Sequence, residues 1–521
     1  MKLIGKVGIV SAMTGISRVF GLLREILMAH FFGTSTLQSA FVIAFRIPNL
    51  FRRLFGEGAL GAAFIPIFTE IAENEGRERA QLFLGRILGI LICVLGLLVG
   101  LCIAGTFVVE VLCGPGSRWT EAMPLTRIML PYALFICLVA ILSAVLNVKD
   151  RFAVPSLTPV ILNVVWIAVL VALCPFLPAE GGWRIGAVCW GILLAGIAQI
   201  LFQLPALRQV GFAFRPVFSG WRDSPYIKQV LLQMGPASLG IALAQINICM
   251  DGLLAFWAAT WAPSALEYAD RIIYLPLGLF GTAFATVLLP TYSRQVAANT
   301  FGEVTKTLTG ALSNLMLLMA PMTVICMTLA SPIVTLIYKH GAFGDDSVRW
   351  TARAILAYAP GLIVFSANKT IVPIFYAQKD IKTPVKVATW CIFGNFTCNL
   401  LAVLFLPDGW KHAGIAGSTV LSSLINTVVL LLLLSRRRLM PNLLPIAFTL
   451  AKALAASALA VLPAVWGIGR LAHFPLPVTL FAGLIVFGVL YPVFCAILMP
   501  NVLRDTLAGL PGVKRFFRKR P

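Results

Sequence analysis

Residues 44–56 read AFRIPNLFRRLFG, and residues 269–281 read ADRIIYLPLGLFG. Seven of the thirteen aligned positions are identical at a constant offset of 225 residues, which is more than the biased composition alone would produce. A second match pairs Lys149-Asp150 with Lys379-Asp380 at an offset of 230, and Pro155 with Pro384 at an offset of 229. The chain therefore contains an internal repeat of about 225–230 residues, and such a repeat constrains the fold more strongly than any single motif.

The amino-acid composition is that of a polytopic membrane protein. Of the 521 residues, 59% are hydrophobic and 12% are charged, whereas an average soluble domain contains about 25% charged residues. An α-helix needs about 20 mainly apolar residues to cross the hydrocarbon core of a bilayer, and the sequence contains fourteen such stretches. The predicted spans lie at residues 5–32, 36–68, 84–112, 125–147, 155–178, 184–207, 229–257, 264–290, 310–338, 352–377, 385–407, 413–435, 444–469 and 475–499.

One repeat contains six predicted spans, and an even number returns the chain to the same side of the membrane. The two copies are therefore parallel, and parallel repeats bind their substrate at the interface between the halves. We expect an all-α polytopic membrane protein with two six-helix lobes and two additional helices. The predicted segments are an N-terminal lobe at 1–222, a C-terminal lobe at 223–440, two extra transmembrane helices at 441–500 and a basic tail at 501–521.

Basic residues lie unevenly in the loops between the predicted spans. Loops on the side of the N-terminus contain 24 Lys and Arg residues, and loops on the opposite side contain six. Because positively charged loops stay in the cytoplasm, we expect both termini to be cytoplasmic and residues 339–350 to lie outside. Residues 1–7 do not introduce an uninterrupted apolar run with a cleavage site, so we expect the first span to be retained.

Several classes of function lack their sequence signals. The net charge of +21 is scattered between apolar runs and not clustered, so no nucleic-acid partner is expected. The eleven cysteines form no CxxC pair and no zinc spacing. A membrane enzyme, such as a polyprenyl-phosphate transferase, is a competing class. Its carboxylate motif is missing, because Asp345-Asp346 lies in a predicted outer loop without a third aspartate.

Charged residues inside the predicted spans are the candidates for function, because each costs a few kcal/mol in a membrane unless it faces water or a partner. Some can be neutralised locally: Arg24 adjoins Glu25, and Arg53 lies four residues before Glu57, on one face of a helix. Spans 1, 2 and 8 nevertheless hold six arginines against four acidic residues. The arginines are Arg18, Arg24, Arg46, Arg52, Arg53 and Arg271.

This excess of arginine predicts a cavity that binds an anion. The planar guanidinium group matches phosphate oxygens in a bidentate geometry, so a phosphate-bearing substrate fits the charge and the chemistry. Arg46 and Arg271 are equivalent in the repeat, which places them across the expected axis from each other. A small cation as the main substrate would require a cavity of the opposite sign.

A second, weaker pattern indicates a coupling ion. Asp251 lies in the middle of span 7, and Asn395 and Asn399 are four residues apart in span 11. Oxygen ligands of this kind suit a hard cation such as Na⁺. We expect either Na⁺ or H⁺ as a coupling ion and no other cofactor. The alternative is that Asp251 is protonated or hydrogen-bonded and has a structural role.

Four segments resemble the lipid II flippases of the MurJ (MviN) family, in the multidrug/oligosaccharidyl-lipid/polysaccharide exporter superfamily. They are SAMTGISRVFGLLRE (11–25), FRIPNLFRRLFGEGALGAAFIP (45–66), YADRIIYLPLGLFGTAFATVLLP (268–290) and FYAQKDIKTPVK (375–386). The resemblance extends over nearly the whole chain, and the segment at 45–66 is its most specific part. The family's fold consists of two six-helix lobes and two C-terminal helices, which agrees with the repeat.

The resemblance implies a substrate and a set of residues that bind it. The substrate is the undecaprenyl-pyrophosphate-linked disaccharide-peptide precursor of peptidoglycan, which moves from the cytoplasmic to the outer leaflet of the bacterial inner membrane. One position departs from the family pattern, because Ser39 stands where some members have an aspartate. The family's essential arginines fall on Arg18, Arg24, Arg52 and Arg271, and Arg46 and Glu57 also match.

The same resemblance leaves two related functions as alternatives. A flippase for another polyprenyl-linked glycan would bind the same pyrophosphate. A multidrug or cation antiporter would have an acidic, aromatic-lined pocket, which the excess of arginine opposes. We expect a monomer, and we expect the helices at 444–469 and 475–499 to form an apolar groove for the polyprenyl tail.

Overall fold

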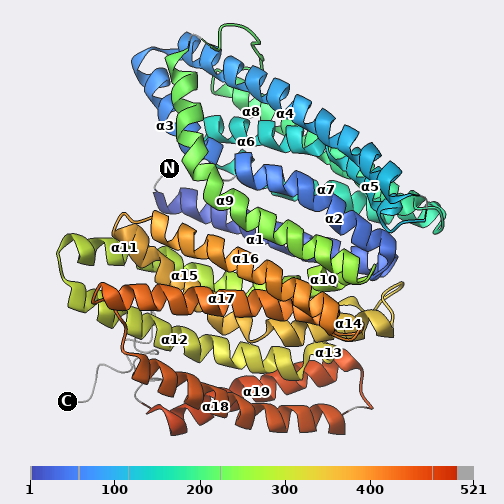
Figure 1. The fold of residues 1–521 in the computed structure, drawn as a ribbon, viewed down its shortest axis with the longest axis vertical. Helices are drawn as coiled ribbons and strands as arrows, with labels where there is room; N and C mark the ends of the chain where they lie inside the picture. Colours follow the sequence, from blue (N-terminus) through green and yellow to red (C-terminus); the bar gives the residue numbers. More distant parts are fainter. Residues whose placement is uncertain (1–2, 57–58, 115, 223, 472, 501–521) are drawn as a thin grey trace. The chain divides into compact units, whose positions relative to one another are not determined.

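The computed structural model describes residues 3–56, 59–114, 116–222, 224–471 and 473–500. Within these ranges all regular secondary structure is helical, with α-helices α1 to α19 and three short irregular helices, η1 to η3 (Figure 1). The predicted all-α class is confirmed. The helices pack into two compact units, of which unit 1 comprises residues 1–264 and 340–344, and unit 2 comprises residues 265–339 and 345 onward.

Unit 1 contains the helices that precede residue 259. α9 belongs to it because it packs along α2 and α3. These units are defined by packing, whereas the lobes at 1–222 and 223–440 are defined by the repeat, so the lobe boundaries stay a prediction. The helices are α1 (Leu3–Phe32), α2 (Thr36–Phe51), α3 (Ala59–Asn74), α4 (Arg77–Cys113), α5 (Trp119–Met129), α6 (Tyr132–Val148), α7 (Ala153–Ala172), α8 (Trp183–Gln209) and α9 (Pro225–Ala258).

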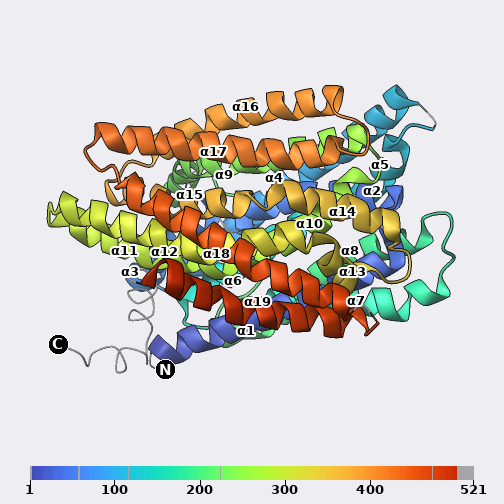
Figure 2. The ribbon, with the colours of Figure 1, turned by 90° about the horizontal axis from the view of Figure 1, so that it is seen from below.

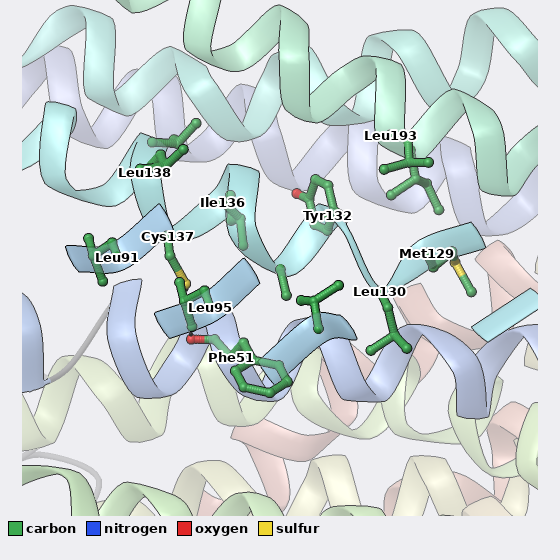
Figure 3. Packing of buried hydrophobic residues seen from close by; sticks show 14 of the residues in the cluster. Phe51, Leu91, Leu95, Met129, Leu130, Tyr132, Ile136, Cys137, Leu138 and Leu193 are labelled. Atoms are coloured by element: carbon green, nitrogen blue, oxygen red, sulfur yellow. Dashed lines mark hydrogen bonds between the residues drawn. The ribbon is translucent and has the colours of Figure 1, made fainter. Parts of the chain in front are cut away.

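The core of unit 1 forms around α6. This helix is apolar on nearly every face, and a helix of that kind is buried on all sides. Ile136 and Cys137 pack among Phe51 of α2 and Leu91 and Leu95 of α4 (Figure 3). The Cys137 thiol donates a hydrogen bond to the Phe51 carbonyl oxygen at 3.7 Å. This hydrogen bond joins α6 to the last residue of α2, directly before η1.

Unit 2 begins within α10 and ends with a pair of helices. α18 packs against both α19 and α12, and these helices lie side by side in Figure 2. Small residues on α18, including Ala453, Ala456 and Ala460, are fully buried at these contacts. The helices are α10 (Ala262–Pro276), α11 (Thr282–Ala297), α12 (Phe301–Thr328), α13 (Ala330–Tyr338), α14 (Asp345–Tyr358), α15 (Gly361–Ala377), α16 (Lys382–Phe405), α17 (Lys411–Arg436), α18 (Leu443–Arg470) and α19 (Leu476–Leu498).

Within the described residues, ten helical segments are long and apolar enough to cross a membrane, and the pair α14 and α15, bent by 44°, would be an eleventh. All of them correspond to predicted spans. The other three predicted spans, at 5–32, 36–68 and 229–257, coincide with α1, with α2 and α3, and with α9. Some side chains in these three regions are outside the described part of the chain. The membrane-protein class is thus confirmed, because ten to eleven of the fourteen predicted spans are helices long and apolar enough to cross a membrane.

The repeat is visible in the backbone at the offset that the sequence predicts. A π-helix, η1, covers Arg52–Gly56, and a second π-helix, η3, covers Leu277–Gly281, which is 225 residues later. In each repeat an α-helix, α3 or α11, follows the π-helix. A single-turn π-helix is rare and frequently marks a functional site. Each repeat therefore contains a π-helix at the same position along its sequence.

The second predicted match is wrong by one residue. The left-handed residue in the turn before α7 is Asp150, with φ of 59°, and its counterpart before α16 is Lys379, with φ of 60°. The turns therefore follow the offset of 229, which the sequence predicts for Pro155 and Pro384, and not the offset of 230 that pairs Lys149 with Lys379. The residue after Lys379 is Asp380, which accepts hydrogen bonds from the Thr383 hydroxyl at 2.6 Å and the Thr383 amide at 3.0 Å. These hydrogen bonds, together with the ion pair to Arg437, lower the pKa of Asp380 to about 2.

The segment after α8, residues 211–221, runs along the start of α4, and we call it the linker strap. The Val217 amide donates to the Gly85 carbonyl oxygen at 2.8 Å. Gln81 makes two hydrogen bonds to the backbone of Ala213, at 2.8 and 2.9 Å. A Cβ atom on Gly89 would lie 2.2 Å from the Val217 carbonyl oxygen. The missing side chain on this face of α4 is what allows the strap to approach so closely.

Candidate functional site

Arg24 of α1 is buried, and its side chain contacts three other side chains. Its guanidinium group donates to Asn163 Oδ1 of α7 at 3.0 Å, forms an ion pair with Glu25, and lies 4.2 Å from the ring centroid of Trp166. The Asn163 amide in turn donates to the Ser17 carbonyl oxygen at 3.2 Å. The local pairing of Arg24 with Glu25 that the sequence suggested is therefore present, and it is part of a contact between α1 and α7.

The surroundings of this contact are apolar and aromatic. Trp166 meets Phe41 and Phe45 of α2 with ring centroids 5.3 and 5.4 Å apart. A buried polar group in such a place costs free energy unless it is hydrogen-bonded. Asn163 and Glu25 supply that compensation, so the side chain of Arg24 is only 11% exposed. Sequence analysis identified neither Asn163 nor Trp166, because neither residue type is unusual in an apolar helix.

Arg18 and Arg52 are more accessible than Arg24. Arg18 is exposed on α1, and Arg52 is half-buried as the first residue of η1. The Arg52 Nε–H donates to Asn49 Oδ1 at 2.9 Å, one turn earlier on α2. Arg53 is half-buried next to it. Glu57, and with it the predicted Arg53–Glu57 pair, lies outside the described residues.

Arg46 connects α2 to α9. It donates to the Ile248 carbonyl oxygen at 2.7 Å. Its guanidinium group lies against Gly252, where a Cβ atom would come within 1.9 Å of Nη1. On the same stretch of α9 the Asn247 amide donates to Asp251 at 3.4 Å. The structure therefore brings Arg46 and the region around Asp251 together within unit 1.

Arg271 lies on α10 in unit 2 and is paired on its own helix. Its guanidinium group donates to Glu267 Oε1 at 2.7 Å, one turn earlier, and 47% of the Arg271 side chain is exposed. An exposed i,i+4 ion pair contributes little to stability. About half of the Arg271 side chain remains exposed beside this pair.

The residues of the predicted cation site belong to different units. Asp251 is half-buried in unit 1, whereas Asn395 and Asn399 are fully buried on α16 in unit 2. In the part of the chain that the structure describes, no group of three or more His, Cys, Asp or Glu side chains could hold a metal ion. The cation site stays a prediction.

One contact was missed by the sequence analysis although its signal is present there. The hydroxyl oxygens of Ser39 on α2 and Ser264 on α10 are 2.9 Å apart, and both residues are fully buried. The two positions are separated by 225 residues, which is the offset of the repeat. Applying that offset to Ser39 would have identified Ser264 as its equivalent across the repeat axis.

The loop at 340–344 closes over the turn between α1 and α2. The Ala342 amide donates to the His30 carbonyl oxygen at 2.8 Å. Gly33 and Gly341 have positive φ, and a Cβ atom on either would lie 2.4 Å from a backbone carbonyl oxygen of the other segment. This loop therefore packs as part of unit 1, although the flanking helices α13 and α14 belong to unit 2.

Comparison with known proteins identifies relatives along most of the chain. The family model described as lipid II flippase MurJ matches residues 28–485. The lipid II flippase MurJ of Burkholderia cenocepacia is 34% identical over 435 residues, which is 82% of this chain and 83% of the relative. The probable lipid II flippase MurJ of Vibrio cholerae is 36% identical over 436 residues, which is 81% of each chain.

Solved structures give the same relationship. A lipid II flippase MurJ in an inward closed conformation superimposes with a TM-score of 0.75 at 25% identity, covering 94% of this chain and 99% of that chain. An inward-facing multidrug-resistance transporter of the MATE family gives a TM-score of 0.67 at 14% identity, covering 81% and 94%, so it shares the fold alone. The match to the family model begins near the end of α1 and includes the rest of both repeats, all of α18 and the first part of α19. The chain belongs to the MurJ family of lipid II flippases.

Proposed function

We propose that this protein is a transporter that moves lipid II, the undecaprenyl-pyrophosphate-linked precursor of peptidoglycan, from the cytoplasmic to the outer leaflet. The observation that carries the proposal is the match to lipid II flippases over residues 28–485. In this role the protein serves cell-wall synthesis and the maintenance of cell shape. It acts as a multi-pass protein of the bacterial inner membrane, with both termini in the cytoplasm, and as a monomer.

The substrate-binding residues in this proposal are cationic. A pyrophosphate group needs planar, bidentate donors, and the arginines of α1, α2, η1 and α10 supply them. Bound substrate cancels the repulsion between these cations and so favours a state in which they are closer together. A ligand can shift a conformational equilibrium only by such a difference in affinity between states. The proposed substrate-binding residues are Arg18, Arg24, Arg46, Arg52, Glu57 and Arg271.

The polyprenyl tail needs a different surface from the head group. α18 and α19 lie outside the repeat and present large exposed apolar side chains, including Phe481, Ile485 and Val489. A hydrocarbon tail gains nothing by lying among charged groups, whereas apolar side chains accommodate it. We therefore assign the guiding of the tail to these two helices, 441–500.

The return of the empty carrier requires a driving force. We propose that a cation, Na⁺ or H⁺, binds with Asp251 and the amides of Asn395 and Asn399. One elementary charge that crosses 100 mV supplies about 2.3 kcal/mol. Exchange of Asp251→Asn is expected to slow turnover and to remove its dependence on sodium or pH. Unchanged transport and unchanged ion dependence would exclude this site.

The function is tested with the purified full chain in liposomes that contain fluorescent lipid II in the inner leaflet. We expect the protein to accelerate the appearance of lipid II in the outer leaflet. Two further arms replace lipid II by another polyprenyl-pyrophosphate-linked glycan or by a cationic dye. A protein that moves only the other glycan, or only the dye, would instead have one of the two related functions.

A further inference from the structure

We infer that Glu25 and Glu267 are internal counter-anions, which occupy substrate-binding arginines while the site is empty and keep single-phosphate lipids out of it. This inference rests on the proposed function, because it concerns the same arginines. It assigns a role in specificity to two carboxylates that the transport chemistry itself does not use. A pyrophosphate head group that binds either arginine would have to displace the carboxylate paired with it.

The first pair lies on α1. Glu25 forms an ion pair with Arg24, and the side chains are only 9% and 11% exposed. Neighbouring residues on a helix point about 100° apart and do not normally face each other. Here the guanidinium group is turned toward the carboxylate while Asn163 takes another donor at 3.0 Å. The two acceptors engage Nη1 and Nη2 of Arg24, so a phosphate can take the donor now held by Glu25 only after the pair separates.

The second pair lies in unit 2. Glu267 accepts from Arg271 at 2.7 Å, and these side chains are 26% and 47% exposed. The two glutamates are 242 positions apart, so they are not equivalent at the repeat offset of 225. The arrangement is therefore not a by-product of the repeat. Each unit independently places one carboxylate on one of its substrate-binding arginines.

A bound carboxylate has two physical consequences for such a site. It lowers the cost of holding a buried arginine in the membrane, because an unpaired charge there is unfavourable. It also competes with any phosphate for the same bidentate donors. This competition lowers the affinity of every ligand for a given arginine by the same factor. Ligands that bind weakly then no longer occupy the site, whereas a ligand that binds tightly still does.

The lower affinity favours the substrate over other lipids because the surrounding membrane contains a large excess of phospholipids. Anionic phospholipids with one phosphate, such as phosphatidylglycerol, carry one net charge, so exchanging a carboxylate for one of them gains little. They are abundant, however, and would fill an unprotected site by mass action. The pyrophosphate of the substrate carries more charge and more acceptor oxygens, and can engage several arginines at once. An internal competitor that rejects the wrong ligand is a known device for specificity.

The test uses the full chain in nanodiscs and undecaprenyl pyrophosphate as the probe. Glu25→Gln and Glu267→Gln keep the size of the side chain and remove its charge. In nanodiscs of a neutral phospholipid we expect each variant to bind the probe about three- to tenfold more tightly than the wild type. In nanodiscs that contain phosphatidylglycerol, the variants should lose this gain, whereas the wild type should change less than twofold.

A matched control and a second variant keep the outcome decisive. Glu303→Gln removes a glutamate whose pair with Lys306 is exposed on α12, and should leave probe binding unchanged in both lipids. If Glu25→Gln does not fold, Glu267→Gln still tests the inference. The Glu267–Arg271 pair is partly exposed, so removing its charge should not prevent folding. Variants that bind no more tightly than the wild type in neutral lipid overturn the inference. Variants that phosphatidylglycerol does not inhibit overturn its selective part. A wild type and variants that all fail to bind the probe instead contradict the proposed function.

Discussion

The arginines of the transmembrane helices differ in how strongly the protein already engages them. Arg24 is buried in its contact with Asn163 and Glu25, whereas Arg52 is half-buried and donates to Asn49, and Arg271 pairs with Glu267 with 47% of its side chain exposed. We expect Arg52→Ala and Arg271→Ala each to abolish transport, because removing one partner of a desolvated charge pair costs about 2–5 kcal/mol. Lysine should restore little activity, since it cannot make the bidentate contact.

The measurement for these variants is flipping of lipid II in proteoliposomes, with membrane insertion verified for each. Arg53→Ala is the matched control, because Arg53 adjoins Arg52 in η1 and is predicted to pair with Glu57. We expect it to retain most of the activity. Wild-type flipping by Arg271→Ala at normal expression would contradict the cationic binding site.

The buried serine pair gives a prediction about stability. Ser39 and Ser264 share a hydrogen bond of 2.9 Å in a fully buried place. Replacing either by alanine should lower the free energy of unfolding by about 1–3 kcal/mol, since one polar partner is left behind. The double variant should lose less than the sum of the single variants. Thermal unfolding in detergent measures the coupling, and strictly additive losses would argue against a direct interaction.

At the scale of single residues the sequence was informative about charges and poor about their partners. An arginine in an apolar stretch is conspicuous, so Arg24, Arg46, Arg52 and Arg271 could be selected directly. Their partners depend on which helices pack together, and no local pattern specifies that α7 contacts α1. Asn163 therefore became visible only in the structure.

Among the helices and their connections, the linker strap is the feature most sensitive to a single atom. Gly89→Ala would place a Cβ atom 2.2 Å from the Val217 carbonyl oxygen. We expect this change to displace the strap and to lower the melting temperature, with a loss of about 1–3 kcal/mol, as is usual for overpacking. Gly96→Ala on the same helix is the control, because no atom lies within 4 Å of its Cβ position. Equal melting temperatures for the two variants would mean that the strap yields without cost.

The two C-terminal helices can be tested by removing them. A chain that ends at residue 440 lacks α18 and α19 but keeps both repeats. If these helices guide the tail, the truncated protein should flip short-chain lipid II analogues better than the undecaprenyl form. Its folding must be verified, since α18 also packs on α12. A folded truncated protein with full activity toward the long-chain lipid would show that the helices only cover the lobe.

Periodicity and repeats predicted some positions of helices and turns correctly and others not. The two π-helices are related by the predicted offset of 225, but the sequence did not predict that either segment would be a π-helix. The pairing of Lys149 with Lys379 failed, because a turn depends on which residue adopts positive φ and not on residue identity. Asp150 and Lys379 both do so, although their side chains have opposite charges.

For the molecule as a whole, the distribution of loop charge predicts the orientation in the membrane. Asp346 lies at the start of α14, and its side chain is 60% exposed. A cysteine at this position should react with an impermeant thiol reagent added to intact cells. The parent chain, which has eleven native cysteines, supplies the background. Labelling that requires permeabilised cells would reverse the proposed orientation.

The fold was largely predictable at this scale, because composition, span length and an internal repeat all act over hundreds of residues. The fourteen predicted spans each coincide with helices of the structure. The division into packed units was not predictable, since the sequence repeat does not reveal that α9 packs against α2 and α3. Packing of this kind depends on side-chain shape, and hydropathy does not record it.

The linker strap also has a consequence for the order of events during synthesis. The contact between Gly85 and Val217 closes a loop that contains α4 to α8. It cannot form until residue 217 has left the ribosome, by which time all of those helices have been made. Domains generally fold in order from the N-terminus as they are synthesised. The strap can thus fasten α4 to α8 together before α10 emerges, whereas the loop at 340–344 joins unit 1 only after much of unit 2 has been made.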